Sequence, residues 1–379
     1  MRISLDVTAV PASPAGAGRY ALELASALAD VRDLGVLFVA RRADGARWRG
    51  IAPDDTVAAV APAARPLRLA WEQLALPGLL RRSHLDVHHS PHYTMPERAR
   101  LPVVVTVHDT TFFDHPEWHE RTKVALFRRA IRVAAQRAAV VVCVSDTTAR
   151  HLSAVCEVAV PIVVAPHGVD HRRFAPRPPA PGADAAVLEG LGLDAARPFI
   201  LYVGTVEPRK DVASLVRSFA RVADVNPDVV LVVAGRPGWG GGPLEVALAE
   251  TERHRARIVR LGYVPDDAVP ALLRRAAVVA YPSLAEGYGL PALEALACGA
   301  PLVTTAGTAM AELAGDAAVL VPPADPDALA GALVSVLEAG RTDPAVKARI
   351  ELGFSIAAAR TWAASASRHF EAYRMALGA

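Results

Sequence analysis

The sequence predicts an α/β protein made of two domains, each built on a parallel sheet. Three observations lead to this fold class. The chain has 379 residues, which exceeds the length of about 250–300 residues at which a single hydrophobic core stops growing. Short apolar runs alternate with longer helical patterns from end to end. A stretch rich in proline, alanine and glycine, residues 174–198, interrupts this alternation near the middle of the chain.

The expected strands are short runs rich in β-branched residues, a pattern typical of strands covered on both faces. In the first half they are Ile3–Val7, Val36–Ala40, Val103–Val107, Val140–Val144 and Ile162–Ala165. In the second half they are Phe199–Val203, Val229–Ala234, Ile258–Leu261, Val278–Tyr281, Leu302–Thr304 and Val319–Val321. Between them, apolar stripes at helical spacing predict helices such as Arg19–Asp30 and Val212–Ala223.

The break in the pattern sets the expected domain boundaries. We expect an N-terminal domain over residues 1–173, a linker over 174–198 and a C-terminal domain over 199–355. A last helical segment, residues 356–379, closes the chain and packs back towards the N-terminal domain. Ligands of open parallel sheets bind at the carboxyl ends of the strands, so we expect the site in a cleft between the two domains.

Composition and charge exclude several classes of protein. With 52% hydrophobic and 21% charged residues, the chain is neither disordered nor fibrous. The 41 basic and 39 acidic residues are spread over both halves, which excludes the one-sided field of a nucleic-acid-binding protein. No apolar run has the length of a membrane span, and the start MRISLDVTAV lacks a secretory pattern. Three widely spaced cysteines form neither a disulfide framework nor a zinc site, so we expect a cytoplasmic protein.

The densest group of candidate residues is the segment YPSLAEGYGLPALE, residues 281–294. Gly287 and Gly289 let backbone amides approach a ligand, and a helix that starts near Leu290 favours an anion at its N-terminus. Glu286 and Glu294 flank this loop and are acceptors suited to sugar hydroxyls. An anion site bordered by hydroxyl acceptors is the outline of a nucleotide-sugar pocket. The alternative is an ordinary helix whose carboxylates interact with its dipole.

A second group, Gly204-Thr-Val-Glu-Pro-Arg-Lys210, follows the strand Phe199–Val203. Arg209 and Lys210 are expected to project from the N-terminus of the next helix, where a guanidinium fork and a point charge together suit a diphosphate. The alternative is a solvated basic pair. Against it, basic side chains are unfavourable at a helix N-terminus, and Lys210 is one of only three lysines.

In the N-terminal half, His108 follows the strand Val103–Val107 and suits a hydrogen bond to a bound sugar or to the reacting oxygens. A structural histidine is the alternative. Further histidines lie nearby in sequence, but they lack the helical spacing with carboxylates that marks a metal site. We therefore expect no metal.

Three further motifs leave alternatives open. The loop GAGRYA, with Gly16 and Gly18, is formally a dinucleotide fingerprint, but the turn before it is too long and the next strand ends in basic residues, so a diphosphate or an acceptor fits better than NAD. The glycine-rich loop 235–242 either borders the pocket or is a surface turn. Tyr263 and Val264 follow a strand at a position suited to a base edge.

The segment Arg121–Arg137 carries six basic residues on an expected helix. Such a helix can rest on an anionic membrane surface. A solvated face is the favoured interpretation. Peripheral contact with the inner face of a membrane is the alternative.

Taken together, these motifs resemble glycosyltransferase family 4, whose members are retaining enzymes of the GT-B fold, with two Rossmann-like domains that face a cleft. The resemblance covers nearly the whole chain: GAGRY, VTVHDTTFFDHPEWH, CVSDTTARHL, VVAPHGVD, LYVGTVEPRKDV, VVAGRPGW, LGYVPDD and EGYGLPALEALACGAPLV, in this order. Ala15 and Ala17 depart from the glycine-glycine and aliphatic residues usual in the first loop. This departure affects the expected approach of that loop to the donor and not the expected fold.

The resemblance implies roles for individual residues. Arg209 and Lys210 match the clamp on the diphosphate, Glu286 matches the residue at the donor sugar or reacting centre, and His108 matches a histidine that reaches the donor sugar. The donor-binding set implied by the motifs comprises Gly16, Gly18, Gly204, Tyr263, Val264, Gly287, Gly289, Leu290 and, on the ribose, Glu294.

The run HDTTFFDHPEW with GTVEPRK resembles the mannosyltransferase-like subgroup, so GDP-mannose is the first expected donor and a UDP- or dTDP-sugar the alternative. The acceptor is a hydroxyl of a glycan, a lipid-linked sugar or a small molecule, bound by the N-terminal domain around Gly16–Tyr20, Pro91–Tyr93 and Phe112–Trp118. Competing classes are a sugar-nucleotide epimerase or phosphorylase, a NAD-dependent oxidoreductase and a catalytically silent binding subunit.

Overall fold

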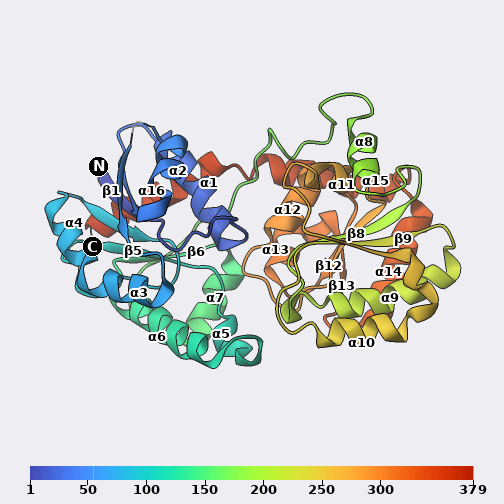
Figure 1. Ribbon diagram of the computed structural model, residues 1–379, viewed down its shortest axis with the longest axis horizontal. Coiled ribbons are helices and arrows are strands. Elements are labelled where there is room, and N and C mark those ends of the chain that lie inside the picture. The colour runs from blue at the N-terminus through green and yellow to red at the C-terminus, as the bar shows by residue number, and fades with distance from the viewer. Residues whose placement is uncertain (54, 379) are drawn as a thin grey trace. The chain divides into compact units, whose positions relative to one another are not determined.

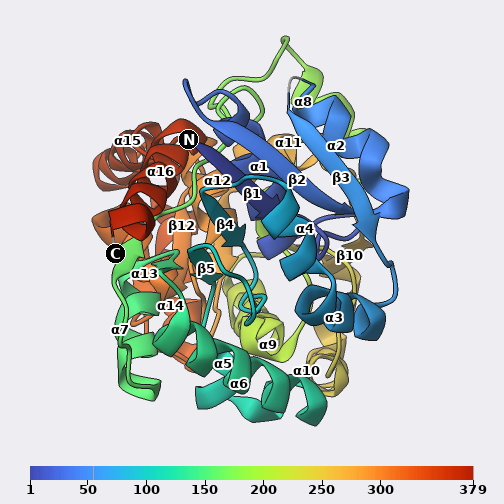
Figure 2. The same ribbon diagram turned by 90° about the vertical axis from the view of Figure 1, so that its left-hand side faces the viewer.

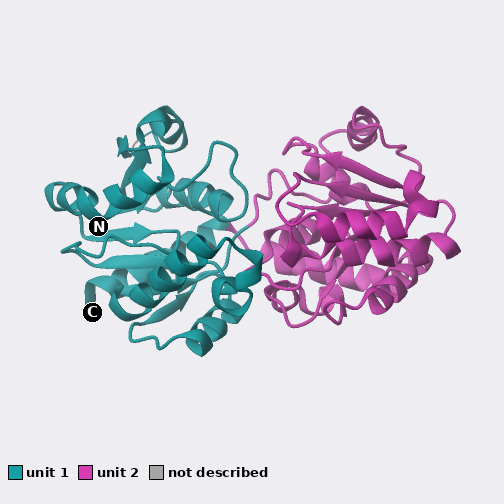
Figure 3. Cartoon of the chain, turned by 60° about the horizontal axis from the view of Figure 1, so that its bottom comes forward, with its two compact units in different colours: residues 1–168, 362–379 teal, residues 169–361 magenta. Residues whose placement is uncertain are grey.

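The computed structural model describes residues 1–53 and 55–378, which form two compact units. Unit 1 comprises Met1–Gly168 and Trp362–Ala379, and unit 2 comprises Val169–Thr361 (Figure 3). Ala379, the last residue of the predicted closing segment, lies outside the described residues. Each unit contains one sheet accompanied by helices (Figure 1).

Unit 1 has a seven-stranded parallel sheet with the order β3-β2-β1-β4-β5-β6-β7. Its strands are β1 Arg2–Asp6, β2 Gly35–Arg41, β3 Thr56–Ala61, β4 Val87–Ser90, β5 Val103–Val107, β6 Val140–Cys143 and β7 Ile162–Val164. Its helices are α1 Ala17–Ala29, η1 Arg42–Asp44, α2 Gly45–Ile51, α3 Arg65–Leu74, α4 Leu76–Arg82, α5 Thr111–Asp114, η2 Pro116–Trp118, α6 Arg121–Arg137, α7 Asp146–Val155 and α16 Trp362–Gly378.

Unit 2 has a six-stranded parallel sheet with the order β10-β9-β8-β11-β12-β13. Its strands are β8 Phe199–Val203, β9 Val230–Ala234, β10 Ile258–Gly262, β11 Val278–Tyr281, β12 Leu302–Thr305 and β13 Ala318–Val321. Its helices are α8 Ala183–Gly190, η3 Pro208–Lys210, α9 Val212–Val225, α10 Gly242–Glu250, η4 Glu252–Arg257, α11 Val269–Arg275, α12 Leu290–Ala297, α13 Ala309–Ala314, η5 Gly315–Ala317, α14 Pro326–Ala339 and α15 Pro344–Ala358.

The strand order reverses once in each sheet. The reversal lies between β1 and β4 in unit 1 and between β8 and β11 in unit 2. At such a switch point the connections leave in opposite directions, so a crevice opens beyond the carboxyl ends of the two central strands. The fold therefore offers one ligand-binding position in each unit.

All the predicted strands are present, and each lies within one residue of its expected ends. Two strands, β3 and β4, have no counterpart among the predictions. β4 lies between β1 and β5 (Figure 2). It reads VHHS, yet His88 and His89 are fully buried. Hydroxyl groups satisfy the rings: His88 Nδ1 lies 2.8 Å from Ser4 Oγ, and His89 Nε2 lies 2.8 Å from Thr106 Oγ1. A strand this polar has no run of apolar residues from which it could have been predicted.

The structure differs from the predicted linker 174–198. Part of that range forms α8, which packs on α11 and belongs to unit 2. Leu188 is fully buried, and Asp184 pairs with Arg274 through two bonds of 2.6 and 2.8 Å. Tertiary contacts thus stabilise a helix that local propensity alone does not favour. The chain passes between the units at Gly168–Val169 and again at Thr361–Trp362.

The closing segment is divided into two helices, and only the second, α16, belongs to unit 1. It lies against α1. His369 Nε2 lies 2.7 Å from the Tyr20 hydroxyl, and the Tyr373 hydroxyl lies 2.8 Å from His89 Nδ1. The end of the chain therefore completes the core of the first unit.

Candidate active site

The predicted cations and the first predicted glutamate meet at the switch point of unit 2. Arg209 and Lys210 lie in η3, after β8, and Glu286 lies in the loop after β11. Because β8 and β11 are neighbouring parallel strands, the loops at their carboxyl ends adjoin. The Leu284 amide donates to the Arg209 carbonyl at 2.8 Å. Sequence segments about 75 residues apart thus form one group.

Glu286 binds both cations. Arg209 Nη1 donates to one carboxylate oxygen at 2.9 Å, and the Lys210 ammonium pairs with the other oxygen. Arg209 Nε also pairs with Glu207 Oε1 at 2.5 Å. The Glu286 side chain is 6% exposed. We call these four residues the ion cluster.

Burial and charge compete in the ion cluster. Burial alone raises the pKa of Glu286, but the adjoining Lys210 and Arg209 charges outweigh burial and hold that pKa at about 2. Burial, and then the Arg209 charge, lower the pKa of Lys210. Glu286 is therefore ionised at neutral pH, and its removal leaves two cations without their common partner.

The position of the cation pair differs from the prediction. Arg209 and Lys210 lie in a 3₁₀ turn rather than at a helix N-terminus. Asp211, with φ 46°, is the N-cap of α9, and its side chain accepts from the Ser214 amide at 3.3 Å. An acidic cap is the favourable arrangement at a helix start, so the cations occupy the preceding turn.

Gly289 fixes the start of α12. It has φ 107° and is the N-cap of this helix, with Leu290 as the first helical residue. A Cβ at Gly289 would lie 2.5 Å from Cγ of the buried Met310. Both the backbone conformation and the close contact therefore require glycine. Glu294 follows one turn later, half-buried, and Gly287 lies in the loop between the ion cluster and the cap.

The loop after β9 borders the same region. A Cβ on Gly235 would lie 1.9 Å from the Gly204 carbonyl oxygen, and the Val206 amide donates to the Arg236 carbonyl at 3.0 Å. The start of loop 235–242 thus contacts the cation-bearing loop, while residues 236–242 are exposed at the surface.

The predicted base-binding residues differ in exposure. Tyr263, after β10, is 55% exposed, whereas Val264 is buried. The Arg236 guanidinium carbon lies 4.4 Å from the centroid of the Tyr263 ring. Arg236 was not singled out from the sequence, although its position two residues after the end of β9 was an available signal. An exposed tyrosine beside a guanidinium offers a stacking surface to a base.

In unit 1, His108 is buried at the carboxyl end of β5. Its Nε2 lies 2.8 Å from the Pro91 carbonyl oxygen, which can only accept a hydrogen bond. Burial lowers the pKa of His108, against the opposing effect of this bond. The ring is therefore neutral, with the proton on Nε2 and an acceptor lone pair on Nδ1.

The first glycine loop has two different requirements for glycine. Gly16 is the N-cap of α1 with φ 49°, a left-handed conformation. Gly18 lies inside the first turn, where a Cβ would approach Pro11 and Pro14 at 3.1 and 3.2 Å. The left-handed conformation of Gly16 and the close approach of Gly18 to the two prolines account for both glycines. The glycine-rich loop therefore does not need a bound dinucleotide to explain its composition.

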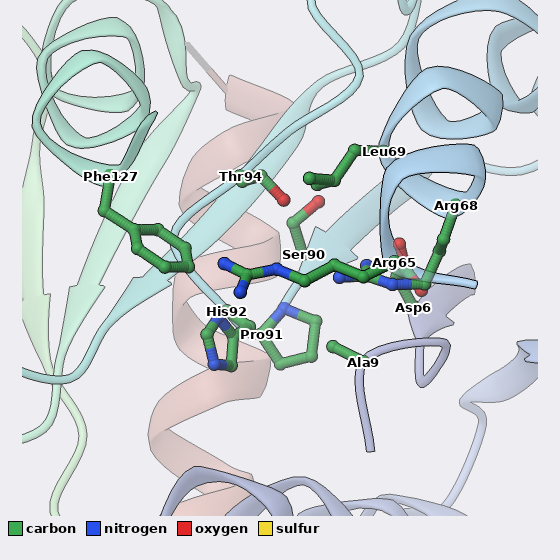
Figure 4. Close-up of a pocket in the computed structure, with 10 residues that line it drawn as sticks. All are labelled: Asp6, Ala9, Arg65, Arg68, Leu69, Ser90, Pro91, His92, Thr94 and Phe127. Carbon is green, nitrogen blue, oxygen red and sulfur yellow. The ribbon is translucent and has the colours of Figure 1, made fainter. Parts of the chain in front are cut away.

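A second candidate position is an open cavity at the switch point of unit 1 (Figure 4). Asp6 at the end of β1 and Ser90 at the end of β4 line it, together with Arg65 and Arg68 of α3 and Phe127 of α6. Neither arginine was singled out from the sequence.

Glu72, on the same helix, supports this cavity wall. It is 2% exposed, and one of its oxygens accepts from Thr94 Oγ1 at 2.8 Å. Burial, and then the Asp6 charge, raise the pKa of Glu72 to about 7.

The basic residues of α6 are mostly engaged within unit 1. Arg129 and Arg137 pair with Glu97, and Lys123 pairs with Glu120. Arg128 and Arg132 lie over the Phe113 ring. These contacts favour the solvated-face interpretation.

Among residues 1–53 and 55–378, no helix combines the length and the hydropathy needed to cross a membrane. In the same described part of the chain, no three histidine, cysteine or acidic side chains are grouped closely enough to hold a metal ion.

Two Rossmann-like parallel sheets, followed by a terminal helix that returns to the first unit, define the GT-B class of glycosyltransferases. Solved structures of this class match the fold. Sucrose-phosphate synthase from Thermosynechococcus elongatus has a TM-score of 0.78 at 20% identity, over 98% of each chain. Anabaena Alr3699/HepE in complex with UDP and glucose has a TM-score of 0.74 at 20% identity, over 98% of this chain and 99% of that one.

Sequence comparison gives the family. Residues 14–173 match the family described as Glycosyltransferase Family 4, and residues 187–350 match Glycosyl transferases group 1. O-antigen chain mannosyltransferase B of Escherichia coli is 31% identical over 275 residues, which cover 72% of this chain and 69% of that protein. The D-inositol 3-phosphate glycosyltransferase of Mycolicibacterium vanbaalenii is 35% identical over 196 residues, 48% of this chain and 41% of that protein. The chain belongs to glycosyltransferase family 4, which confirms the resemblance.

The cap of α12 gives a first test. Gly289→Ala places a Cβ at a positive φ and against Met310, so we expect a loss of about 2 kcal/mol or more in the free energy of unfolding. Thermal or urea unfolding measures this loss. Gly331→Ala, in the exposed interior of α14 where a Cβ meets nothing within 4 Å, is the control and should stabilise the protein slightly. Equal stability of the two variants would contradict the assigned cap.

Glu72 gives a test in pH. Its unfolded-state carboxyl loses its proton near pH 4.5, whereas the folded protein keeps that proton up to about pH 7. Between these values the unfolded state binds fewer protons, so stability falls as pH rises, by about 2–3 kcal/mol. Relative to Glu72→Gln, wild type should lose stability over this window, as measured by urea unfolding at each pH. Glu189→Gln, an exposed carboxyl on α8, controls for net charge, and parallel profiles of wild type and Glu72→Gln would refute the shift.

Proposed function

We propose that this glycosyltransferase moves a hexose, in the first instance mannose from GDP-mannose, to a hydroxyl acceptor with retention and without a metal. The observation that carries the proposal is the ion cluster at the switch point of unit 2, next to the glycine-capped start of α12. Cations and helix-start amides are suited to a leaving diphosphate. The Escherichia coli relative is by name a mannosyltransferase, which supports the sugar.

In this proposal three residues of the ion cluster and several residues around it have assigned tasks. Arg209 and Lys210 bind the developing charge on the diphosphate, and Glu286 orients both of them through one carboxylate. Glu294 binds the ribose, and Tyr263 and Val264 contact the base. His108 Nδ1 accepts from a hydroxyl of the donor sugar, because its proton is committed to the Pro91 carbonyl.

No protein nucleophile is assigned. The acceptor hydroxyl attacks the face of the anomeric carbon from which the diphosphate departs, so the new glycosidic bond forms as the bond to the diphosphate breaks. The acceptor proton passes to the departing phosphate oxygen. We place the reaction on the cytoplasmic side.

A UDP-sugar donor is the second candidate. The HepE structure that shares this fold is a complex with UDP and glucose, and nothing in the ion cluster distinguishes one base from another. The choice between bases depends on the region around Tyr263, Val264 and Arg236.

The donor is tested by thermal unfolding with GDP-, UDP-, dTDP- and ADP-sugars and with NAD, in the presence of a chelator. A ligand that binds only the folded state stabilises it by about 2.7 kcal/mol at a hundredfold excess over its Kd. We expect the largest shift with GDP-mannose. A shift with another nucleotide sugar would identify that sugar as the donor and leave the assignment as a glycosyltransferase unchanged. A response to NAD alone would overturn the proposal.

Lys210→Ala tests the clamp. Loss of one electrostatic partner of the leaving group should lower kcat about 10²–10³-fold, corresponding to about 2.7–4 kcal/mol. The rate of nucleoside diphosphate release from the donor measures this effect. Lys347→Ala, an exposed lysine on α15, is the matched control and should leave the rate unchanged. Lys210→Arg keeps a charge opposite Glu286 and separates misfolding from lost catalysis, and wild-type turnover in Lys210→Ala would remove Lys210 from the mechanism.

A further inference from the structure

The switch point of unit 1 has the features of a second anion site. The open cavity there lies beyond the carboxyl ends of β1 and β4, where the strand order reverses. Figure 4 shows the Arg65 side chain extending from α3 across the cavity towards Phe127. Arg68, three residues later, also lines the cavity, so both guanidinium groups lie on the cavity side of α3.

The two guanidinium groups are not neutralised by ion pairs. Within the described ranges 1–53 and 55–378, neither Arg65 nor Arg68 has a carboxylate oxygen within 4 Å. Arg68 Nη1 has a long contact of 3.4 Å with Thr8 Oγ1, and the Arg65 guanidinium lies 5.6 Å from the centroid of the Phe127 ring. Their donors therefore remain available to a ligand.

The groups around these cations leave the cavity positive. Asp6 is the one carboxylate among the lining residues, and its Oδ1 accepts from the Thr8 amide at 2.9 Å. Burial lowers the pKa of His92 to about 3, so that ring is neutral. Glu72, behind Thr94, has a pKa of about 7 and carries only part of a charge at neutral pH. Two arginines thus line the cavity with one acidic residue, Asp6, while the charge of Glu120 interacts with Arg65 from outside the lining.

We propose that this cavity binds a phosphate group of the acceptor, with Arg65 and Arg68 as its ligands and Asp6 accepting a hydrogen bond from an acceptor hydroxyl. Guanidinium groups present several N–H donors in a plane, which match the three oxygens of a phosphate ester. The site is not needed for the donor diphosphate, because unit 2 has its own cations. The assignment to the acceptor rests on the proposed glycosyl transfer.

The phosphate has two sources with the same chemistry. It belongs either to a soluble sugar or polyol phosphate, or to a lipid-linked phosphate. α3 also exposes Leu67 and Leu74, at 62% and 73% exposure. Their helical spacing places them on the face of α3 opposite the cavity arginines. The experiment therefore has a soluble arm and a vesicle arm.

Binding is measured on the full chain at constant ionic strength. The soluble probes are inorganic phosphate and glucose 1-phosphate, and calorimetry measures their binding. The lipid probe consists of phosphatidylcholine vesicles with and without undecaprenyl phosphate, and co-sedimentation measures binding of the protein to them. The test variant is Arg65→Gln with Arg68→Gln, and the matched control is Arg81→Gln with Arg82→Gln, two exposed arginines on α4 that do not line the cavity.

We expect the test variant to weaken binding of at least one probe about 100-fold, since each charge-assisted contact is worth roughly tenfold or more. The control should change Kd by about twofold at most. Binding of the soluble probe alone identifies a sugar phosphate, and binding of the doped vesicles alone identifies a lipid-linked phosphate. Absence of binding to every probe, or equal weakening by the control, overturns the site.

Donor binding separates this inference from the proposed function. The test variant should keep its thermal stabilisation by GDP-mannose, because its substitutions lie outside unit 2. If no nucleotide sugar stabilises the wild type while phosphate binding still depends on Arg65 and Arg68, the anion site stands and the glycosyl-transfer assignment fails. If nucleotide sugars bind and phosphate probes do not, the glycosyl-transfer assignment stands and the anion site fails.

Discussion

The ion cluster around Glu286 is the constraint on which the rest of unit 2 depends. One buried carboxylate links two loops that follow neighbouring strands, and it does so through two cations. A buried charge of this kind is tolerated only when its partners are in place. The loops after β8 and β11 must therefore keep their lengths and their glycine positions, because a displaced Arg209 or Lys210 leaves Glu286 desolvated and unpaired.

The cluster also limits how a diphosphate can be bound. Glu207 and Glu286 together already balance the charges of Arg209 and Lys210. Under the proposed function, an incoming diphosphate would meet cations whose fields are largely cancelled at long range but whose remaining N–H groups are held in position. Its additional stabilisation would then come from backbone amides, such as those at the start of α12 after Gly289. Glycine at this cap, required by its positive φ and by the contact with Met310, thus fixes the helix start on which the proposal relies.

Much of this arrangement follows from the sequence, and the exceptions have physical causes. Valine-rich strands are predicted correctly because both faces are buried. β4 is not, because its two histidines are buried through hydroxyl partners that come from distant strands and helices. α8 is stabilised by Asp184 and Arg274, which are 90 residues apart. The motifs identified Glu286, Arg209 and Lys210, whereas their mutual pairing required the adjacency of β8 and β11.

Arg65 and Arg68 illustrate a different limit. They belong to no glycine-rich loop and follow no strand directly, so no motif marks them. Their spacing of three on a helix indicates a shared face but not what that face borders. Only the sheet order shows that α3 lies over the switch point of unit 1.

The two switch points differ in how their cations are held, and this difference has a physical consequence. In unit 2 the cations are half-buried and paired with buried carboxylates, so added salt screens them less than it screens exposed charges. In unit 1 Arg65 is exposed and Arg68 half-buried, and neither is paired with a carboxylate of the described residues. Attraction of an anion to unit 1 should therefore fall with ionic strength more steeply than attraction to unit 2. Under the proposed function, an anionic acceptor would be steered by its charge, whereas the nucleotide sugar would be recognised mainly by the fixed geometry of the ion cluster and the α12 cap.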